Sequence, residues 1–339
     1  RNVPDLFFLK KSCIEVGKNL KQGSVIVFES TVYPGVTNDF CVPLLEKNSK
    51  LKYKKSFNVG YSPERISVGD NYYTLKNITK VISGDSEFTI KKIKYVYSKI
   101  IKNIYIAKNI EVAEFSKVLE NTQRDLNISL MNELSIICNK MKISSHDVIN
   151  AASTKWNFHK YNPGLVGGHC IGVDPYYLSY KAKKIGYKPI VINASRYVND
   201  KMSNFIYKQI INKTKLNDRK NKKLKILFLG LTFKENCKDI RNSKIFDVIK
   251  KFQKKKHQVF LNDPYAIKYE VEKLYDEKIT EFNKLPSNFD VVVISVPHKF
   301  YLQKGFNLIS KFNKKNSLFV DLKSSFINIK NKNLKLLRL

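Results

Sequence analysis

The sequence predicts an α/β protein with two sheet-containing regions joined by a layer of helices. At both ends of the chain, short apolar segments of strand length alternate with amphipathic helical segments. Between these regions, from Ile110 to about Lys140 and from about Asn193 to Lys215, apolar residues recur at helical spacing without a helix breaker. A chain of 339 residues is long enough for each region to bury its own core.

The first region alternates strands and helices in an order that is typical of a parallel sheet with helices on its faces. No G-x-G-x-x-G sequence follows any of its strands, so a dinucleotide-binding sheet here would lack its first strand and its phosphate-binding turn. The expected segments are a helix over Asp5–Leu20, a strand over Ser24–Phe28, a helix over Asn38–Glu46, strands over Phe57–Tyr61 and Lys80–Ser83, a helix over Glu87–Ile101 and a strand over Asn103–Ala107.

A second α/β region follows a polar segment, Asn217–Lys223, which has the composition of a linker. Its strands are rich in β-branched and aromatic residues and have the length of buried parallel strands. The expected segments are strands over Leu224–Gly230, Gln258–Asp263, Asp290–Val296 and Ser317–Asp321, with a helix over Lys244–Lys256.

The net charge of +33 does not by itself indicate a nucleic-acid partner. Only 7 of the 62 basic residues are Arg, whereas proteins that read nucleic acids rely on Arg for bidentate contacts. The remaining basic residues are Lys spread over the whole chain. Its longest apolar runs, such as Val291–Ile294, are far shorter than the roughly 18 residues of a membrane helix. We therefore expect a cytoplasmic protein with neither a nucleic-acid nor a membrane partner.

The five cysteines include no C-x-x-C pair and no His at zinc-binding spacing. A disulfide framework or a metal site is therefore not expected. Cys13, Cys41 and Cys138 lie among apolar neighbours and are interpreted as core residues.

The most informative local feature is the glycine-rich segment Asn162–Leu178, which contains Cys170. Four of the 13 glycines of the chain lie in it and allow close approach of the backbone to a ligand. Asp174 followed by Pro175 predicts the start of a helix, where the helix dipole favours a thiolate. Cys170 is thus either a nucleophile or a buried thiol in a tight turn. Asp174 is a cap or a catalytic residue, and His169 is a weaker candidate for the base.

Polar residues elsewhere give weaker signals. Lys117 and Asn121 lie four positions apart on one helical face with Arg124 a turn beyond, and taken alone they favour a solvated polar face. Glu64 and Thr31 each follow a predicted strand, where functional groups of open sheets are commonly found.

Taken in order, five segments resemble the UDP-sugar 6-dehydrogenases, a branch of the UDP-glucose/GDP-mannose dehydrogenase family. The match extends over essentially the whole chain. The sequences of its motifs are most similar to those of bacterial UDP-N-acetylglucosamine and UDP-N-acetylgalactosamine enzymes of surface-polysaccharide synthesis. The segments are Glu29–Gly35, Tyr61–Arg65, Lys117–Leu126, the segment around Cys170, and Gly230–Arg241.

The resemblance implies an NAD-dependent, four-electron oxidation of the C6 hydroxyl of a UDP-N-acetylhexosamine to the uronate. Cys170 would form a thiohemiacetal and then a thioester. Lys117 and Asn121 would stabilise the oxyanion, and Glu64 and Asp174 would transfer protons with an ordered water. Thr31 would lie near the nicotinamide or that water.

The resemblance also implies substrate-binding residues and an organisation of the chain. Besides Glu64, Lys117 and Asn121, the sugar nucleotide would contact Tyr161, Asn162, Pro163, Gly164, Gly167 and Lys234, while Arg241 would approach the NAD phosphates. The implied fold has two Rossmann-like domains, the first incomplete. The expected boundaries are an NAD-binding part over 1–108, a central helical part over 109–216 that forms a homodimer or higher homo-oligomer, and a UDP-sugar-binding part over 217–339.

Departures from the family pattern limit these implications. The first βαβ unit has no counterpart, so we expect an N-terminally truncated enzyme that does not bind NAD normally by itself. Val68 stands where UDP-glucose enzymes have a second Glu, and Cys237 is interpreted as incidental. UDP-glucose or UDP-N-acetylmannosamine remains an alternative substrate, and a non-catalytic protein that binds sugar nucleotides is an alternative of another class.

Overall fold

The computed structural model describes residues 3–66, 74–168, 170–214, 223–329 and 331–339. The chain divides into two compact units. The first comprises residues 1–124 and 173–193, and the second comprises residues 125–172 and 194–339. The long helices α4 and α7 contribute residues to both units. The predicted linker lies outside the described residues apart from Lys223.

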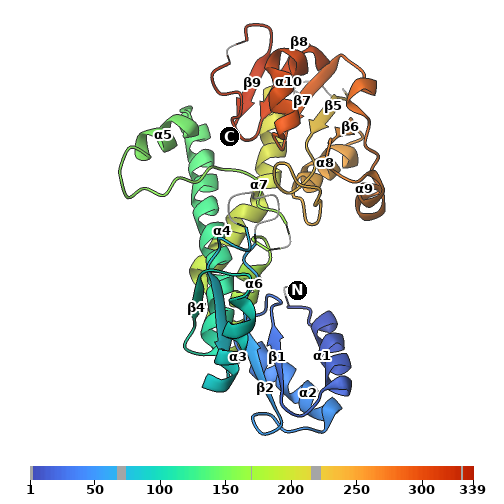
Figure 1. The fold of residues 1–339 in the computed structure, drawn as a ribbon. Coiled ribbons are helices and arrows are strands. Elements are labelled where there is room, and N and C mark those ends of the chain that lie inside the picture. The colour runs from blue at the N-terminus through green and yellow to red at the C-terminus, as the bar shows by residue number, and fades with distance from the viewer. Residues whose placement is uncertain (1–2, 67–73, 169, 215–222, 330) are drawn as a thin grey trace. The chain divides into compact units, whose positions relative to one another are not determined.

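The first unit is an α/β layer built on a four-stranded sheet with the order β1-β2-β3-β4 (Figure 1). One side of the sheet is covered by α1, η1 and α2, whose apolar residues pack together with those of β2. The elements are α1 (Phe7–Asn19), β1 (Ser24–Phe28), η1 (Thr37–Cys41), α2 (Val42–Ser49), β2 (Phe57–Tyr61), β3 (Lys80–Gly84), α3 (Glu87–Tyr97), β4 (Ile104–Ile106), α4 (Ile110–Met141) and α6 (Asp174–Lys184).

The sheet of the first unit departs from the expected all-parallel arrangement at one place. Strands β1 and β2 are parallel over five residue pairs, and β3 and β4 are parallel over three. Strands β2 and β3, however, are antiparallel and share only the pairs Gly60–Gly84 and Tyr61–Ser83. The alternation of apolar residues identifies a strand but not its direction, which depends on how the intervening connection returns the chain.

The second unit contains a five-stranded sheet in which every pairing is parallel, with the order β6-β5-β7-β8-β9. Helix α10 is packed against one face, and α7, α8 and α9 against the other. The elements are α5 (Ser145–Ala152), α7 (Ile190–Thr214), β5 (Lys225–Leu229), α8 (Ile245–Lys254), β6 (Gln258–Asn262), α9 (Lys268–Tyr275), η3 (Phe282–Lys284), β7 (Phe289–Ile294), α10 (Lys299–Ile309), η4 (Ser310–Phe312), β8 (Asn313–Asp321) and β9 (Lys335–Arg338).

Burial on both faces explains the continuous apolar strands of this sheet. Ile226 and Phe228 point to the cluster formed with α7 and α8, whereas Leu227 and Leu229 point to the cluster formed with α10. The α/β fold class with a helical central segment is confirmed, and every predicted strand is present. Strand β9 and helices α5, α9 and α10 were not predicted, because their apolar residues are few or interrupted.

Candidate functional site

The carboxyl ends of β1 and β2 lie side by side, since Phe28 is the register partner of Tyr61. Two predicted site residues follow directly from these ends. Thr31 is half-buried, and Glu64 is exposed and accepts a hydrogen bond from the Ile66 N–H at 2.6 Å. Both residues therefore lie at one edge of the first unit's sheet, where open α/β sheets place their ligands.

A buried lysine, which the sequence analysis did not identify, lies beneath this edge. Lys80 is 3% exposed, and its Nζ lies 2.9 Å from Glu29 Oε1 and 3.9 Å from Glu64 Oε2. Burial raises the pKa of Glu29, but hydrogen bonds from Tyr97 and Lys80 outweigh burial and lower it overall. In the sequence, Lys80 stood out only as a charged residue at the first position of a predicted strand.

Helix α4 and the start of α6 form a second polar cluster in the first unit. Lys117 and Asn121 are 9% and 6% exposed, so their interpretation as a solvated face is wrong. Asn121 Nδ2 donates to Asp174 Oδ2 at 2.5 Å. Burial raises the pKa of Asp174 to about 6, against the opposing effects of Asn121 and Lys117. Arg124, a turn beyond, is exposed.

Asp174 does not cap its helix, contrary to one of the two alternatives from the sequence. It is the first residue of α6, whose N-cap is Val173, and no side chain caps the helix. Its carboxylate instead faces α4, where it can hold a proton close to Lys117 and Asn121.

The turn that follows β1 is not available for a phosphate. The Glu114 carboxylate accepts hydrogen bonds from the Gly35 N–H at 2.6 Å and the Thr37 N–H at 2.9 Å. Glu114 is fully buried, and burial raises its pKa despite these bonds. The Gly35 and Thr37 N–H groups therefore already have a carboxylate partner and are not available to bind a phosphate.

In the second unit, Cys170 lies in a loop of residues 161–172, which we call the Cys170 loop. All five cysteines lie in the described part of the chain, and Cys170 alone among them is not buried. Gly167 and Gly168 pack tightly against the segment after β5. A Cβ on Gly167 would lie 2.7 Å from the Asn242 carbonyl oxygen, and one on Gly168 would lie 2.9 Å from the Phe233 ring. Glycine is therefore required for this contact.

A buried network holds the start of the Cys170 loop. The Asn132 side chain accepts from the Gly164 N–H at 2.7 Å and donates to the Gly164 carbonyl at 3.0 Å. Asn132 also donates to Asn199, which in turn donates to the buried Asp125 at 2.7 Å. Arg196 forms an ion pair with Asp125 at 2.6 Å. The four polar residues of this network were not identified as site residues from the sequence, where each resembles an ordinary polar helix residue.

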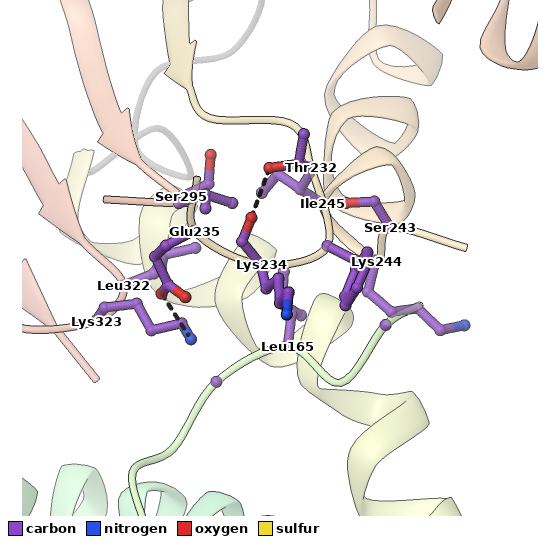
Figure 2. A pocket seen from close by; sticks show the side chains of 14 residues that line it. Leu165, Thr232, Lys234, Glu235, Ser243, Lys244, Ile245, Ser295, Leu322 and Lys323 are labelled. Carbon is purple, nitrogen blue, oxygen red and sulfur yellow. Dashed lines mark hydrogen bonds and ion pairs between the residues drawn. The ribbon is translucent and has the colours of Figure 1, made fainter. Parts of the chain in front are cut away.

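Figure 2 shows a pocket between this loop and the carboxyl end of the second sheet. Its empty volume of about 410 Å³ includes open solvent. Thr232 Oγ1 donates to the Lys234 carbonyl at 2.8 Å, and Lys323 forms an ion pair with Glu235 at 3.2 Å. The lining residues are Gly164, Leu165, Gly167, Thr232, Phe233, Lys234, Glu235, Ser243, Lys244, Ile245, Ser295, Val296, Leu322 and Lys323.

The pocket brings together three predicted substrate-binding residues, namely Gly164, Gly167 and Lys234. The preceding residues Tyr161, Asn162 and Pro163 do not line it and are half-buried, exposed and buried, respectively.

Arg241 lies in the segment that follows β5 and is bound to Asp239. Its Nη2 forms an ion pair with Asp239 Oδ2 at 2.6 Å. The hydrogen bond that the guanidinium donates to Asp239 raises its pKa, and the nearby Cys170 sulfur adds to this effect. Cys237 is buried and donates from Sγ to the Lys234 carbonyl at 3.3 Å, a structural contact within the loop.

Comparison with known proteins accounts for all three segments of the chain. The NAD binding domain, central domain and UDP binding domain profiles of the UDP-glucose/GDP-mannose dehydrogenase family match residues 1–101, 111–201 and 227–328. Protein CapL of Staphylococcus aureus is 46% identical, over 89% of this chain and 71% of that protein. The UDP-N-acetyl-D-glucosamine 6-dehydrogenase of Salmonella typhi is 45% identical, over 94% of this chain and 75% of that protein. The chain belongs to this family.

Solved structures agree with this assignment. The UDP-N-acetyl-D-mannosamine dehydrogenase of Pyrococcus horikoshii has a TM-score of 0.88 at 26% identity, covering 99% of this chain and 77% of that one. The NDP-N-acetyl-D-galactosaminuronic acid dehydrogenase of Methanosarcina mazei has a TM-score of 0.84 at 26% identity, covering 99% and 73%. The resemblance inferred from the sequence motifs is confirmed. The family comprises UDP-glucose and GDP-mannose dehydrogenases, and its NAD binding domain identifies NAD as the cofactor.

His169 and Val68 lie outside the described residues. Among the residues that are described, no cluster of three or more His, Cys, Asp or Glu side chains could hold a metal ion. Over the same residues, no helix combines the length and hydropathy of a membrane span.

Proposed function

We propose that this dehydrogenase oxidises the C6 hydroxyl of a UDP-N-acetylhexosamine, UDP-N-acetylglucosamine or UDP-N-acetylgalactosamine, to the uronate. The identities support an N-acetylhexosamine, because relatives at 44 to 45% identity are UDP-N-acetyl-D-glucosamine 6-dehydrogenases, whereas UDP-N-acetyl-D-mannosamine dehydrogenases are 28 to 31% identical. The product would be a precursor for a capsule or O-antigen polysaccharide.

The observation that carries this proposal is the accessibility of Cys170 in a glycine-bound loop beside a pocket. When the alcohol has lost a hydride and a proton, the Cys170 thiolate adds to the aldehyde carbon and forms a C–S bond. Loss of a second hydride from that carbon gives a thioester. Water then adds, the C–S bond breaks, and the carboxylate and the thiolate are released.

The buried cluster on α4 supplies the groups that oxyanion chemistry needs. We assign Lys117 to charge stabilisation and Asn121 to a hydrogen bond to the developing oxyanion. Asp174 has a pKa of about 6 and can exchange a proton near neutral pH, so we assign it, with Glu64, to proton transfer through a water.

NAD would accept one hydride per molecule, so two NAD would be reduced for each uronate formed. We assign Thr31 to its nicotinamide end, because this half-buried residue follows the carboxyl end of β1. We assign Arg241, which Asp239 holds in its protonated form, to the NAD phosphates.

We assign the pocket of the second unit to the UDP part of the substrate. Lys234 provides positive charge for the diphosphate, and the backbone at Gly164 and Gly167 permits close approach. The segment that we assign to the sugar nucleotide also includes Tyr161, Asn162 and Pro163.

We further propose a homodimer or higher homo-oligomer through the central helical segment. Large apolar side chains of α4 are exposed within each unit, with Phe115 and Leu119 at 42% and 51% and Leu130 and Ile137 at 59% and 48%. Burial of such residues against a second copy would be favourable. The division into functional parts at 1–108, 109–216 and 217–339 belongs to the same proposal.

The test is a panel of UDP-sugars, with NADH and uronate measured for each. The expected result is oxidation of a UDP-N-acetylhexosamine with two NADH formed per uronate. Oxidation of UDP-glucose alone would correct the sugar, and a single NADH per product would contradict the four-electron reaction. Binding of a UDP-sugar by calorimetry without any NADH would instead favour a non-catalytic sugar-nucleotide-binding protein.

A further inference from the structure

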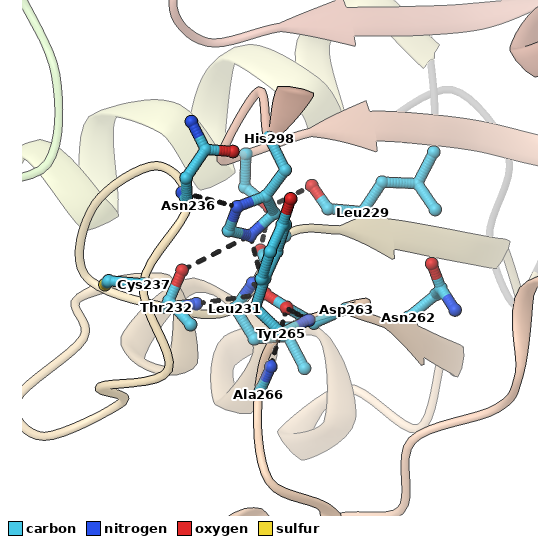
Figure 3. A network of polar contacts seen from close by, with 12 residues as sticks. Leu229, Leu231, Thr232, Asn236, Cys237, Asn262, Asp263, Tyr265, Ala266 and His298 are labelled. Atoms are coloured by element: carbon cyan, nitrogen blue, oxygen red, sulfur yellow. Dashed lines mark hydrogen bonds and ion pairs between the residues drawn. The ribbon is translucent and has the colours of Figure 1, made fainter. Parts of the chain in front are cut away.

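The second unit contains a completely buried histidine at the carboxyl end of its sheet. His298 follows β7, immediately precedes α10, and is 0% exposed. Figure 3 shows its contacts with Asn236, Thr232 and Asp263. It lies against the segment of residues 231–237, which we call the Lys234 loop. Neither the proposed reaction nor substrate binding assigns a role to this side chain.

The hydrogen bonds of His298 determine which nitrogen carries the proton. Its Nδ1 lies 2.9 Å from the backbone nitrogen of Asn236, which can only donate, so Nδ1 is an acceptor. Its Nε2 lies 2.9 Å from Asp263 Oδ2 and therefore donates to that carboxylate. The ring is thus a neutral bridge with one acceptor and one donor, and both are used.

Asp263 is the fixed end of this bridge. Its carboxylate also accepts hydrogen bonds from the Leu231 N–H at 2.6 Å, the Tyr265 N–H at 2.8 Å and the Ala266 N–H at 2.9 Å. Burial raises the pKa of Asp263, but the bonds from His298 and the backbone outweigh it and keep the carboxylate charged.

The Lys234 loop is therefore held at both ends. Asp263 binds its start at Leu231, and His298 binds its end at Asn236. The residues between these points, Lys234 and Glu235, line the pocket. A loop tied at both ends loses less conformational entropy on binding than one tied at a single end.

We propose that His298 is a positioning residue that holds the Lys234 loop in the conformation that binds the nucleoside diphosphate of the substrate. This inference rests on the proposed function, because it takes Lys234 as a ligand of the diphosphate. His298 does not touch the substrate; it acts through the backbone of Asn236 and through Asp263.

A second histidine provides a matched control. His257 is 9% exposed, and its Nδ1 accepts from the Leu224 N–H at 3.1 Å, at the opposite end of β5. Like His298, it accepts a hydrogen bond from a backbone N–H, but it lies away from the residues that line the pocket. Loss of either histidine removes a buried hydrogen bond, so a purely structural role predicts the same outcome for both.

The experiment measures the Kd for UDP by calorimetry and the KM and kcat for the UDP-sugar in four variants. For H298A we expect Kd and KM to rise about tenfold with kcat changed by less than about twofold, since one loop-fixing hydrogen bond is lost. H298Q, whose amide offers one acceptor and one donor, should stay within about threefold of the unsubstituted protein. H257A should lower the melting temperature but leave the Kd for UDP unchanged.

A fourth variant removes another contact of the Lys234 loop, the Thr232 hydroxyl, which also lies 3.3 Å from His298 Nε2. T232V removes the hydroxyl that donates to the Lys234 carbonyl, and we expect it to raise the Kd for UDP by about threefold. If H298A does not fold, H298Q and T232V still test the proposal. Complete loss of UDP binding in H298Q, together with unchanged UDP affinity in T232V, would overturn the positioning role of His298.

The remaining outcomes are also decisive. Equal UDP affinity in H298A and the unsubstituted protein, or an equal loss in H257A, would overturn the positioning role alone. Absence of UDP binding by the unsubstituted protein would overturn the substrate assignment of the pocket, and this inference with it.

Discussion

The carboxyl ends of the two sheets differ in how their polar groups are used. In the first unit, strands β1 and β2 end in ionisable side chains, and Glu29 and Glu64 both lie within 3.9 Å of the Lys80 Nζ. In the second unit, Asp263 and His298 at the strand ends are bonded to each other and to backbone N–H groups. The first edge presents a cluster of ion-paired side chains, whereas the second uses a charged Asp263 and His298 to fix the loop beside the pocket.

This difference follows from burial. Every residue of β1 is only half-buried, whereas the last four residues of β5 and of β7 are buried. A buried polar group must be satisfied by a partner, and the partners at hand are the backbone groups of neighbouring loops. We therefore expect substitutions at reactive groups to change kcat and substitutions in the second unit to change binding or stability.

The largest expected effect is that of Cys170→Ser. Uronate formation should fall by about a thousandfold or more, because a hydroxyl is a far weaker nucleophile than a thiolate. The measurement is NADH and uronate from the UDP-sugar oxidised by the unsubstituted protein.

Cys237→Ser is the matched control, since Cys237 is buried and bound within its own loop. Normal uronate formation by the Cys170 variant, or equal loss in the Cys237 variant, would contradict the assigned nucleophile.

A smaller but still large effect is expected for Lys117→Met. Loss of a charge at the oxyanion should lower kcat by about a hundredfold while the chain length of the side chain is kept. Steady-state kinetics measure this, with Lys140→Met on the exposed part of α4 as the control. A change confined to KM would show that Lys117 binds substrate without stabilising the oxyanion.

Gly230→Ala should have the largest effect on stability, about 3 kcal/mol. Gly230 has φ +94°, and a Cβ there would lie 2.4 Å from the Val296 carbonyl oxygen. Gly186→Ala in the first unit has a similar φ of +84° but nothing within 4 Å, so it should cost only about 1 kcal/mol. Urea unfolding measures both, and equal losses would show that backbone strain alone, without the steric contact, determines the cost.

The smallest expected effect is on the pH dependence of stability through Asp174. Because its pKa is raised to about 6 in the folded state, the folded state holds the proton where the unfolded chain has already lost it. The free energy of unfolding should therefore fall by about 2 kcal/mol as pH rises from about 4 to 7. Asp174→Asn should remove this decrease and also the ascending limb of kcat near pH 6. An identical pH profile in the variant would contradict the assignment.

Much of the fold could be predicted because the relevant information is local. Predicted strands such as Ser24–Phe28 and Phe57–Tyr61 are observed with the same bounds, since short apolar runs between turn residues specify a strand by themselves. The antiparallel pairing of β2 with β3 could not be predicted, because strand direction depends on partners distant in the sequence.

The candidate site shows the same division. The ordered motifs around Cys170, Lys117 and Lys234 are sufficient to place the chain in its family. Lys80 and Asn132 were missed, because each acts through a partner far along the chain, Glu29 in one case and Gly164 in the other. Asp174 was identified, but its cap interpretation was wrong.

The sequence by itself determined the α/β class and the family, and it indicated candidate reactive side chains. Only the tertiary structure decided which polar residues are buried and which hydrogen-bond partners they have. These partners distinguish charged residues of the candidate site from residues that hold a loop in place. The physical reason is that strand and helix patterns depend on neighbouring residues, whereas the cost of burying a polar group is set by the whole surrounding fold. Lys117 and His298 look equally polar in the sequence, and only their surroundings separate a charged residue assigned to the oxyanion from a neutral bridge.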